Sequence, residues 1–482
     1  MLSNRTKQTQ SNLNLLPPRH NLSQKLLERE LGERSMDTQS KTLCQNCLNI
    51  TLSNKERKSP VQRVMDWVIL PNSNLKMLTK RTPDAVNSTK KSKIVLNSCI
   101  NCRSIASPNY SLMCNVARKL PQRLQEMEHS LAGYDKIFSS VWLSNNQVVV
   151  GTKCQKLVII NVETGQQTVV TDYNSPLLCS NATISPQCSG IHSISINPSK
   201  TLLAVGAGKP NESISIYHLP TFDRIALLEG HDDLVFSVNW LNDTTLVSGS
   251  RDRSVKTWKL NQGFLKRKVD NLELNPPVVN VYRHAQTKVE HSQKVRDMVV
   301  DYHTSQFFTL SADGFVKVWD ANRSQVVGSV PLMHTNETVC MGIDSENHYV
   351  TVGSQSHISL IDPREKEIVH IFDSLDEGWG VRSMCIHSDI LTIGGGLGKM
   401  SFYDLRAMKY LEWESNNNPL NVNLQSGTGW LNKDAIYQRH FSNTQVHNAI
   451  YTVAYDASRT RFLAAGGPLQ LNLKGSYVSL WE

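Results

Sequence analysis

The stretch GHDDLVFSVNWLNDTTLVSGSRDRSVKTWKL, residues 230–260, decides the fold of this chain. Apolar and polar residues alternate in VFSVNW, and a turn of small residues, SGSRD, separates two further runs that end at Trp258. Alternation with a period of two, bounded by turn residues, predicts short antiparallel strands joined by tight turns. The stretch therefore predicts one small sheet, which begins at a Gly-His pair and ends at a tryptophan.

The same unit recurs along the chain. The Gly-His pair, the small-residue turn and the final aromatic residue are typical of a WD repeat, which forms one four-stranded blade of a propeller. Three spacings between successive strand ends are 41 or 42 residues, and the longer spacings leave polar insertions near 165–188, 262–291 and 412–446, which we expect to be surface loops. The unit predicts an all-β, seven-bladed WD-repeat β-propeller whose third strands end at Ile160, Tyr217, Trp258, Trp319, Ile361, Tyr403 and Trp481.

The last unit lacks an outer strand, because the sequence runs only one residue past Trp481. We expect a strand near 126–131, on the N-terminal side of Lys136, to complete that blade and close the ring. The propeller is predicted to span 115–482.

Charge divides the chain into two parts. Residues 1–120 hold 20 Lys and Arg against 7 Asp and Glu, and residues 121–482 hold 31 against 35, which gives net charges of +13 and −4. The first part is polar and poor in aromatic residues, a composition typical of disorder. We predict a disordered basic arm at 1–59, a short docking segment at 60–78 and a disordered linker at 79–114.

Targeting signals favour the cytoplasm and the nucleus. The N-terminus lacks the apolar run of a secretory signal, and no segment approaches 18 consecutive apolar residues. Lys80-Arg81 and the basic cluster at 90–93 resemble a split nuclear import signal, although a solvated tail would have the same composition. We expect no membrane partner.

The stretch GGGLGKMSFYD, residues 394–404, invites comparison with a phosphate-binding loop. That loop requires G-x-x-x-x-G-K-[ST] at the start of a helix, whereas Ile393 and Met400 break the pattern here, and an alternating strand pattern follows. The glycines are predicted to form a hairpin turn, and a nucleotide-dependent enzyme is not supported.

Basic residues gather at one mouth of the predicted ring. In a WD blade the first strand begins, and the second strand ends, beside the central channel on the same face. Only Asp313 is expected to oppose the basic residues placed there, so the sequence predicts an anion-binding mouth, although pairing of each cation with a neighbouring acid is the alternative. The residues of this basic mouth are Lys136, Lys153, His192, Arg251, Arg296 and Arg382.

Nothing near these cations has the arrangement of a nucleophile with a base, and paired carboxylates are absent from the pattern. We therefore expect a non-catalytic protein without a cofactor.

Two successive blades end in Asp-x-Arg: Asp362 with Arg364, and Asp404 with Arg406. Each arginine lies beyond the third strand, at the mouth opposite the basic one. This pattern resembles the W-D-x-R box of the WD-repeat substrate receptors of cullin-4 RING ubiquitin ligases, although Ile361 and Tyr403 replace its tryptophan. Within those receptors the chain resembles the family of the cullin-4-associated factor numbered twelve, on the segments GTKC (151–154), CSGIHSISINPSKTLLAVGAG (188–208), SGSRDRS (248–254), SQSHISLIDPR (354–364), GVRSM (380–384), GTGWLN (427–432) and AAGGPL (464–469).

The resemblance implies a receptor that binds protein substrates by acidic, Glu-Glu type C-terminal degrons. It also implies docking on the damaged-DNA-binding adaptor of the ligase through the Asp-x-Arg residues and through PVQRVMDWVIL (60–70), which resembles the short adaptor-docking segment of the family. A segment that caps the propeller would look the same. The apolar residues expected to contact the adaptor are Val64, Trp67, Val68 and Leu70.

Two C-x-x-C pairs, Cys44 with Cys47 and Cys99 with Cys102, leave a zinc site open. Their wide separation and the lack of nearby glycine or aromatic residues favour free thiols, so no metal is predicted.

The sequence thus predicts the substrate-recognition subunit of a cullin-4 RING ubiquitin ligase. The alternative is a WD-repeat scaffold in which the basic arm and the basic mouth bind nucleic acid or another anionic partner. Binding that falls steeply with salt and ignores peptide C-termini would favour this alternative.

Overall fold

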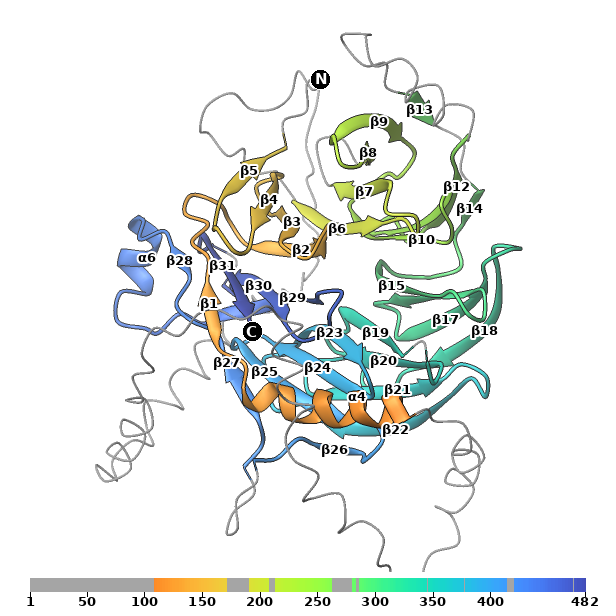
Figure 1. The fold of residues 1–482 in the computed structure, drawn as a ribbon. Coiled ribbons are helices and arrows are strands. Elements are labelled where there is room, and N and C mark those ends of the chain that lie inside the picture. Colours follow the sequence, from red (N-terminus) through yellow and green to blue (C-terminus); the bar gives the residue numbers. More distant parts are fainter. Residues whose placement is uncertain are drawn as a thin grey trace, which may run out of the picture. The chain divides into compact units, whose positions relative to one another are not determined.

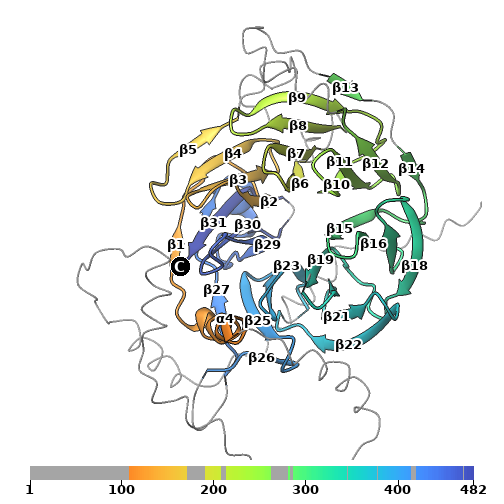
Figure 2. The same ribbon diagram turned by 45° about the vertical axis from the view of Figure 1, so that its right-hand side comes forward.

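The computed structural model describes residues 108–170, 190–207, 213–261, 280–282, 286–344, 346–376, 378–413, 420–470 and 472–482, with side chains from residue 114 onward. The described residues form seven sheets around a common axis (Figure 2), and their strands pair antiparallel except at Asn280–Tyr282, which pairs parallel at the edge of one sheet. The predicted seven-bladed propeller is therefore confirmed. None of the described helices is long and apolar enough to cross a membrane.

Each blade begins with a strand next to the axis, and each of these inner strands contacts the inner strands of both neighbouring blades, so they form a closed circle. The inner strands are β2 (Ile137–Trp142), β6 (Ile191–Ile196), β10 (Val235–Trp240), β15 (Val295–Asp301), β19 (Cys340–Asp344), β23 (Val381–His387) and β29 (Asn448–Tyr455).

The next two strands of each blade carry most of the buried apolar residues. The second strands are β3 (Gln147–Thr152), β7 (Leu202–Ala207), β11 (Thr245–Ser250), β16 (Gln306–Ser311), β20 (Tyr349–Gly353), β24 (Ile390–Gly395) and β30 (Phe462–Pro468). The third strands are β4 (Leu157–Asn161), β8 (Ile214–His218), β12 (Val255–Lys259), β17 (Phe315–Asp320), β21 (His357–Asp362), β25 (Lys399–Asp404) and β31 (Gly475–Trp481).

The outer strands vary in length from two to seven residues. They are β5 (Gln167–Val169), β9 (Asp223–Leu228), β14 (Gln286–Lys288), β18 (Gln325–Pro331), β22 (Glu367–Asp373) and β26 (Lys409–Tyr410), with β1 (Glu126–Glu128) in the last blade. Residues Glu126–Glu128 pair antiparallel with Ser479–Trp481 of β31, so both ends of the propeller share one sheet (Figure 1). This pairing closes the ring.

The long insertions are not loops throughout, and the expectation of surface loops was wrong in part. The second and third insertions contribute β13 (Asn280–Tyr282), β14, β27 (Asn423–Gln425), β28 (Trp430–Leu431) and the helix α6 (Ala435–His440). These strands are two or three residues long and pair at sheet edges. They consequently lack the apolar alternation by which strands are predicted.

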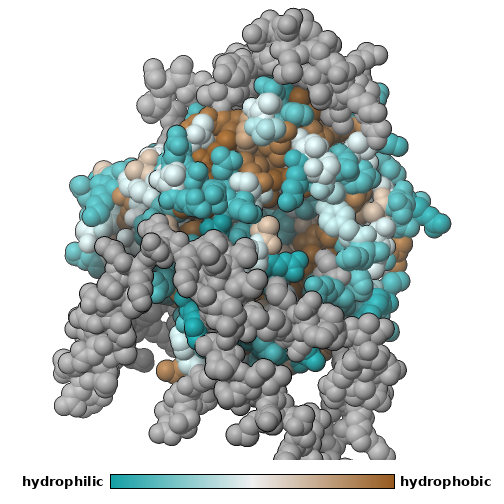
Figure 3. All heavy atoms as spheres, in the orientation of Figure 1, coloured by the Kyte–Doolittle hydropathy of each residue, from teal (hydrophilic) through white to brown (hydrophobic). Residues whose placement is uncertain are grey.

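The core lies between the sheets, in clusters that each join neighbouring blades. Hydrophilic residues cover much of the face seen in Figure 3, and apolar residues show between them. Two blades also contain a buried polar network. In each network a histidine bonds to an aspartate and to a hydroxyl group, and the hydroxyl group accepts a hydrogen bond from a tryptophan. The residues are His231, Asp252, Ser248 and Trp258 in one blade, and His291, Asp313, Thr309 and Trp319 in the next.

A helix precedes the propeller and packs against one blade. The helix α4 (Pro108–Lys119) and the 3₁₀-helix η3 (Leu120–Gln122) lead into β1. Ala117 and Leu124 belong to the same buried cluster as Phe402 of β25, which fixes this segment on the blade of β23–β26 (Figure 1).

Candidate functional site

A β-bulge near the start of the inner strand positions most of the predicted channel residues. The pairing with the second strand skips one residue, as at Phe236, which lies between the paired residues Val235 and Ser237. A bulged residue leaves the ladder and is re-aimed, which is why bulges are frequent beside functional sites. Six of the seven blades share this feature, and the skipped residues are Phe138, His192, Phe236, Arg296, Arg382 and Tyr451.

The fifth blade is the exception, because its inner strand has no bulge at Cys340. Cys340 pairs regularly with Gly353, so it is not bulged. Its thiol is buried and contacts the carbonyl oxygen of Val381 in the next blade at 3.7 Å. Cys340 therefore belongs to the core between two blades.

Backbone hydrogen bonds bring the end of each second strand to the start of the first strand. The amide of Lys153 donates to the carbonyl of Lys136, and that of Arg251 donates to Leu234, both at 2.8 Å. Corresponding bonds join Ala312 to Lys294, Gln355 to Asn336 and Gly396 to Gly380. The basic residues predicted at the starts of first strands and those predicted at the ends of second strands therefore lie at one mouth.

Three arginines at this mouth act on one another. Burial, followed by the positive charges of Arg251 and Arg382, lowers the pKa of Arg296. The Arg296 guanidinium lies over the ring of Phe236, 5.1 Å from its centroid. The Nε atoms of Arg296 and Arg382 are buried without a hydrogen-bond partner. A buried donor left unsatisfied in this way costs free energy.

The two lysines form a second group around Asp135. The Asp135 carboxylate lies 3.2 Å from the ammonium of Lys153 and 3.7 Å from that of Lys136. Lys136 is only 3 % exposed, and its ammonium also donates to the carbonyl of Leu473. Burial lowers the pKa of Lys136 to about 8. In this structure Lys136 thus contributes charge beneath the mouth, whereas Lys153 is nearer to solvent.

Aromatic rings connect these groups along one side of the channel. Phe138 stacks on His192 with centroids 4.6 Å apart, and both meet a further ring edge-on, Phe138 at Tyr451 and His192 at Phe236. Burial raises the pKa of Tyr451 to about 12, with Arg382 and Asp135 acting on it in opposite directions. An aromatic wall excludes water, which strengthens the interaction of nearby charges.

The expectation that only Asp313 opposes the cations was wrong. Asp313 binds His291 at 3.1 Å within its own blade. Three other carboxylates face the basic mouth from the loops that enter a blade: Asp135, Asp233 at 3.5 Å from Arg251, and Glu337 at 2.7 Å from Arg382. The basic mouth therefore combines five cations with three carboxylates and keeps an excess of positive charge.

A recurrent triplet would have revealed these channel residues directly. An aliphatic residue, a large residue and then Ser, Thr or Asp recur at six inner strands, as in IFS, VFS and VRS. The third residue bonds to the next blade: Ser383 donates to the carbonyl of Ile450 at 2.8 Å, and Asp297 accepts from the amide of Met341 at 2.8 Å. The large middle residue consequently lies between two anchored positions.

The Asp-x-Arg residues lie at the other end of the blades, because β21 and β25 each run six residues away from the turn at the basic mouth. The two pairs differ. Arg364 binds Asp362 through two hydrogen bonds of 2.7 and 3.0 Å. Asp404 instead accepts from Arg118 of α4 at 2.5 Å, and from the backbone amides of Arg406 and Ala407. Arg406 is exposed, and no described residue pairs with its guanidinium.

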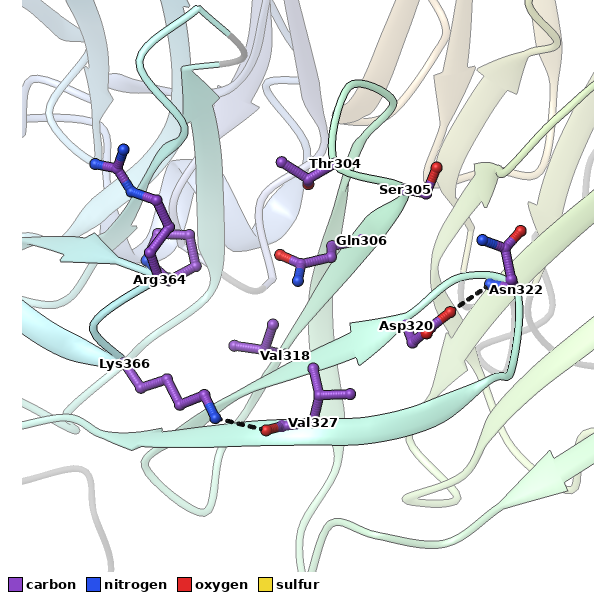
Figure 4. A pocket seen from close by; sticks show the side chains of 10 residues that line it. Thr304, Ser305, Gln306, Val318, Asp320, Asn322, Val327, Arg364 and Lys366 are labelled. Atoms are coloured by element: carbon purple, nitrogen blue, oxygen red, sulfur yellow. Dashed lines mark hydrogen bonds between the residues drawn. The ribbon is translucent and has the colours of Figure 1, made fainter.

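A pocket of about 300 Å³ opens beside Arg364, between the blade of β15–β18 and the next blade. Arg364 and Lys366 line one side, and Asp320 and Asn322 line the other (Figure 4). Lys366 donates to the carbonyl of Val327 at 2.9 Å. The pocket is polar and of mixed charge, and it belongs to the same face as the Asp-x-Arg residues.

The glycine-rich stretch is the predicted hairpin turn between β24 and β25. A Cβ atom on Gly396 would lie 2.5 Å from the carbonyl oxygen of Trp379, and the Gly396 amide donates to Asp376 at 2.6 Å. The glycines thus admit the close approach of the preceding loop.

Some predictions fall outside the described residues. These are the docking segment with Val64, Trp67, Val68 and Leu70, the basic arm with its import signal, and the C-x-x-C pairs. Within the described ranges, Cys114, Cys154, Cys340 and Cys385 form no disulfide, and no group of acidic, His and Cys residues has the arrangement of a metal site.

Residues 120–482 match the family described as "DDB1- and CUL4-associated factor 12 beta propeller". The chain belongs to this family. The match covers every blade, from β1 to β31, so the family assignment rests on the whole propeller and not on one repeat.

More distant relatives share parts of this propeller. The chain is 27 % identical over 173 residues to "Ribosome biogenesis protein WDR12 homolog" of Drosophila mojavensis, and 27 % identical over 156 residues to "F-box/WD repeat-containing protein mec-15" of Caenorhabditis elegans. These matches span 35 % and 32 % of this chain, and 36 % and 34 % of the relatives. Among solved structures, "Structure of U3-55K" matches with a TM-score of 0.53 at 14 % identity, over 74 % of this chain and 98 % of that chain, which shows the fold alone.

Proposed function

We propose that this protein is the substrate-recognition subunit of a cullin-4 RING ubiquitin ligase and that its basic mouth binds acidic, Glu-Glu type C-terminal ends. Membership of the DDB1- and CUL4-associated factor 12 family supports the ligase role. The observation that carries the ligand is the pair of buried, unpartnered Nε donors on Arg296 and Arg382. Its role is binding and presentation of substrate, not catalysis.

The basic mouth fits a chain end better than an internal acidic segment. A peptide that ends in two glutamates presents three carboxylates close together, and arginine forks bind carboxylates through paired hydrogen bonds. The unpartnered donor of Arg296 lies beside the ring of Phe236, where charge-assisted bonds are strengthened. His192, stacked in that wall, is placed to donate to a terminal carboxylate.

The direct test compares two ten-residue acidic peptides that end in Glu-Glu, one with a free carboxylate and one with a C-terminal amide. We expect the free acid to bind the full-length protein at least about tenfold tighter, because the amide removes one charge-assisted contact worth about 1.5–3 kcal/mol. Equal affinity of the two peptides for the protein, or no binding of either, would contradict C-terminal recognition.

The affinity for the acidic end is expected to fall as the pH rises above about 8. Lys136 has a pKa of about 8 in the free protein, so it loses its charge there, and the bound anion raises that pKa. Above pH 8, binding then requires that Lys136 takes up a proton. Below this pH the affinity should not depend on pH. Calorimetric titration between pH 7 and 9 measures this slope, and Lys136→Met should abolish it.

We propose that the opposite face holds the ligase adaptor. Arg406 is the exposed Asp-x-Arg arginine, since Arg118 occupies the Asp404 carboxylate in its place. Arg406→Ala should weaken capture of the adaptor about tenfold or more in a pull-down or surface-binding titration, as expected for loss of a charged interface contact.

The peptide affinity of Arg406→Ala should equal that of the wild type, because the basic mouth lies at the other end of the blade. A matched control is Arg439→Ala on α6, an exposed arginine in the last turn of that helix. Loss of both activities in a folded Arg406→Ala protein would count against two separate faces.

A further inference from the structure

One carboxylate of the basic mouth, that of Glu337, forms an ion pair with Arg382 of the candidate site. Glu337 Oε2 accepts a hydrogen bond of 2.7 Å from the Arg382 guanidinium, whose same nitrogen also donates to the carbonyl of Trp379. The negative charge of Glu337 also favours the protonated form of Arg296, against burial and the charges of the other arginines. Glu337 thus acts on the two arginines that hold the unpartnered donors.

The backbone around Glu337 holds it in this position. Glu337 has a φ of 51°, in the left-handed region that a residue other than glycine seldom adopts. The preceding carbonyl, of Asn336, accepts from the amide of Gln355 at 2.9 Å. A Cβ atom on Gly380 would lie 3.0 Å from Arg382 and 3.4 Å from Glu337, so glycine leaves room for the ion pair. Strained backbone of this kind is frequent at functional sites.

The ion pair between Glu337 and Arg382 is unequal in its exposure to solvent. The Glu337 side chain is 51 % exposed, whereas that of Arg382 is 15 % exposed. Glu337 can therefore turn into solvent while the arginine stays in place. Its carboxylate leaves both buried Nε donors unsatisfied, so it fills the site only in part.

We propose that Glu337 sets the affinity threshold of the basic mouth: it occupies Arg382 as a stand-in for a ligand carboxylate and must be displaced when an acidic chain end binds. This inference rests on the proposed function of the basic mouth. A ligand with only its terminal carboxylate exchanges one ion pair for another and gains little. A ligand with further carboxylates, such as one ending in Glu-Glu, also satisfies the remaining donors.

The test uses Glu337→Gln in the full-length chain, with ten-residue peptides that end in Glu-Glu or in Gly-Gly and are otherwise identical. We expect the variant to bind both peptides about tenfold tighter, because the same ion pair with Arg382 is broken in each case, so that binding of the Gly-Gly peptide becomes measurable. Glu365→Gln, an exposed glutamate next to Arg364 on the opposite face, should change neither affinity.

A second variant, Glu337→Asn, guards against a disturbed loop, because asparagine tolerates a left-handed backbone. If the wild type binds the Glu-Glu peptide and neither variant binds either peptide more tightly than the wild type does, the role of Glu337 is overturned while the proposed function stands. If the wild type and both variants bind no peptide with a free C-terminus, the proposed function itself is wrong, and this inference falls with it.

Discussion

Replacing Arg296 with Met should reduce the affinity for a peptide that ends in Glu-Glu by about 100-fold, which corresponds to about 2.7 kcal/mol. Arg296 contributes a buried donor that no described residue satisfies, so its hydrogen bond is made only with the ligand. Methionine keeps the contact with the ring of Phe236 but has no charge.

The same substitution should leave the propeller as stable as the wild type or make it more stable. Burial and two neighbouring arginines disfavour the positive charge of Arg296 in the protein without ligand. Replacing Arg296 with an uncharged residue removes this unfavourable contribution to the free energy of folding. Peptide titration and thermal unfolding of one preparation measure both effects. Arg323→Met, at an arginine that is 78 % exposed, is the control and should change neither. An unaltered peptide affinity, or a marked drop in melting temperature, would contradict the assignment of Arg296 to the anion site.

Replacing the next residue, Asp297, with Ala should have the opposite effect on stability and lower the free energy of unfolding by about 3 kcal/mol. The Asp297 carboxylate accepts from the amides of Met298 and Met341, each at 2.8 Å, and from the hydroxyl of Ser237 at 3.2 Å. It thereby joins three successive blades. Each buried donor left without an acceptor costs about 1–3 kcal/mol.

The pH dependence distinguishes this carboxylate from an ordinary surface acid. Burial raises the pKa of Asp297 to about 6, despite its hydrogen bonds, whereas an unfolded aspartate titrates near 3.9. The folded protein therefore binds the proton more tightly, and the stability contributed by this group falls as the pH rises through about 6. Asp297→Asn, which keeps one acceptor oxygen, serves as the matched variant.

Urea denaturation of the wild type and Asp297→Asn at pH 5 and pH 8 provides the measurement. The wild type should gain stability relative to Asp297→Asn at pH 5, where its carboxyl is largely protonated. A relative loss at pH 5 would mean that the carboxylate is stabilised by its surroundings as an anion, against the direction inferred from burial.

The seven blades were predictable because each inner and third strand carries an alternating pattern ending in a marked residue, as in VFSVNW and at Trp258. The strands β14 and β27 were less visible, since three residues are too few to show an alternating pattern. The sequence likewise places five cations at one mouth, where the structure also has them, because the position of a residue in the repeat determines its place on the ring.

The carboxylates were not predictable by the same reasoning. Asp135, Asp233 and Glu337 precede their inner strands, in loops that the repeat does not align, and their contacts depend on side-chain direction and backbone conformation. The release of Arg406 depends on a contact between residues 286 positions apart, Arg118 and Asp404. A local Asp-x-Arg pattern contains no information about that distant competitor.

The strand β1 has a consequence for the time at which this protein becomes competent during its synthesis. Its three residues can pair only after residues 479–481, which are the last of the propeller to be synthesised. Before that, β1 has no partner strand. The circle of inner strands also stays open between β2 and β29, which carry Phe138 and Tyr451. Pairing across such a distance is slow to form. A chain that lacks residues 479–481 should therefore leave the circle of inner strands open and the basic mouth incomplete.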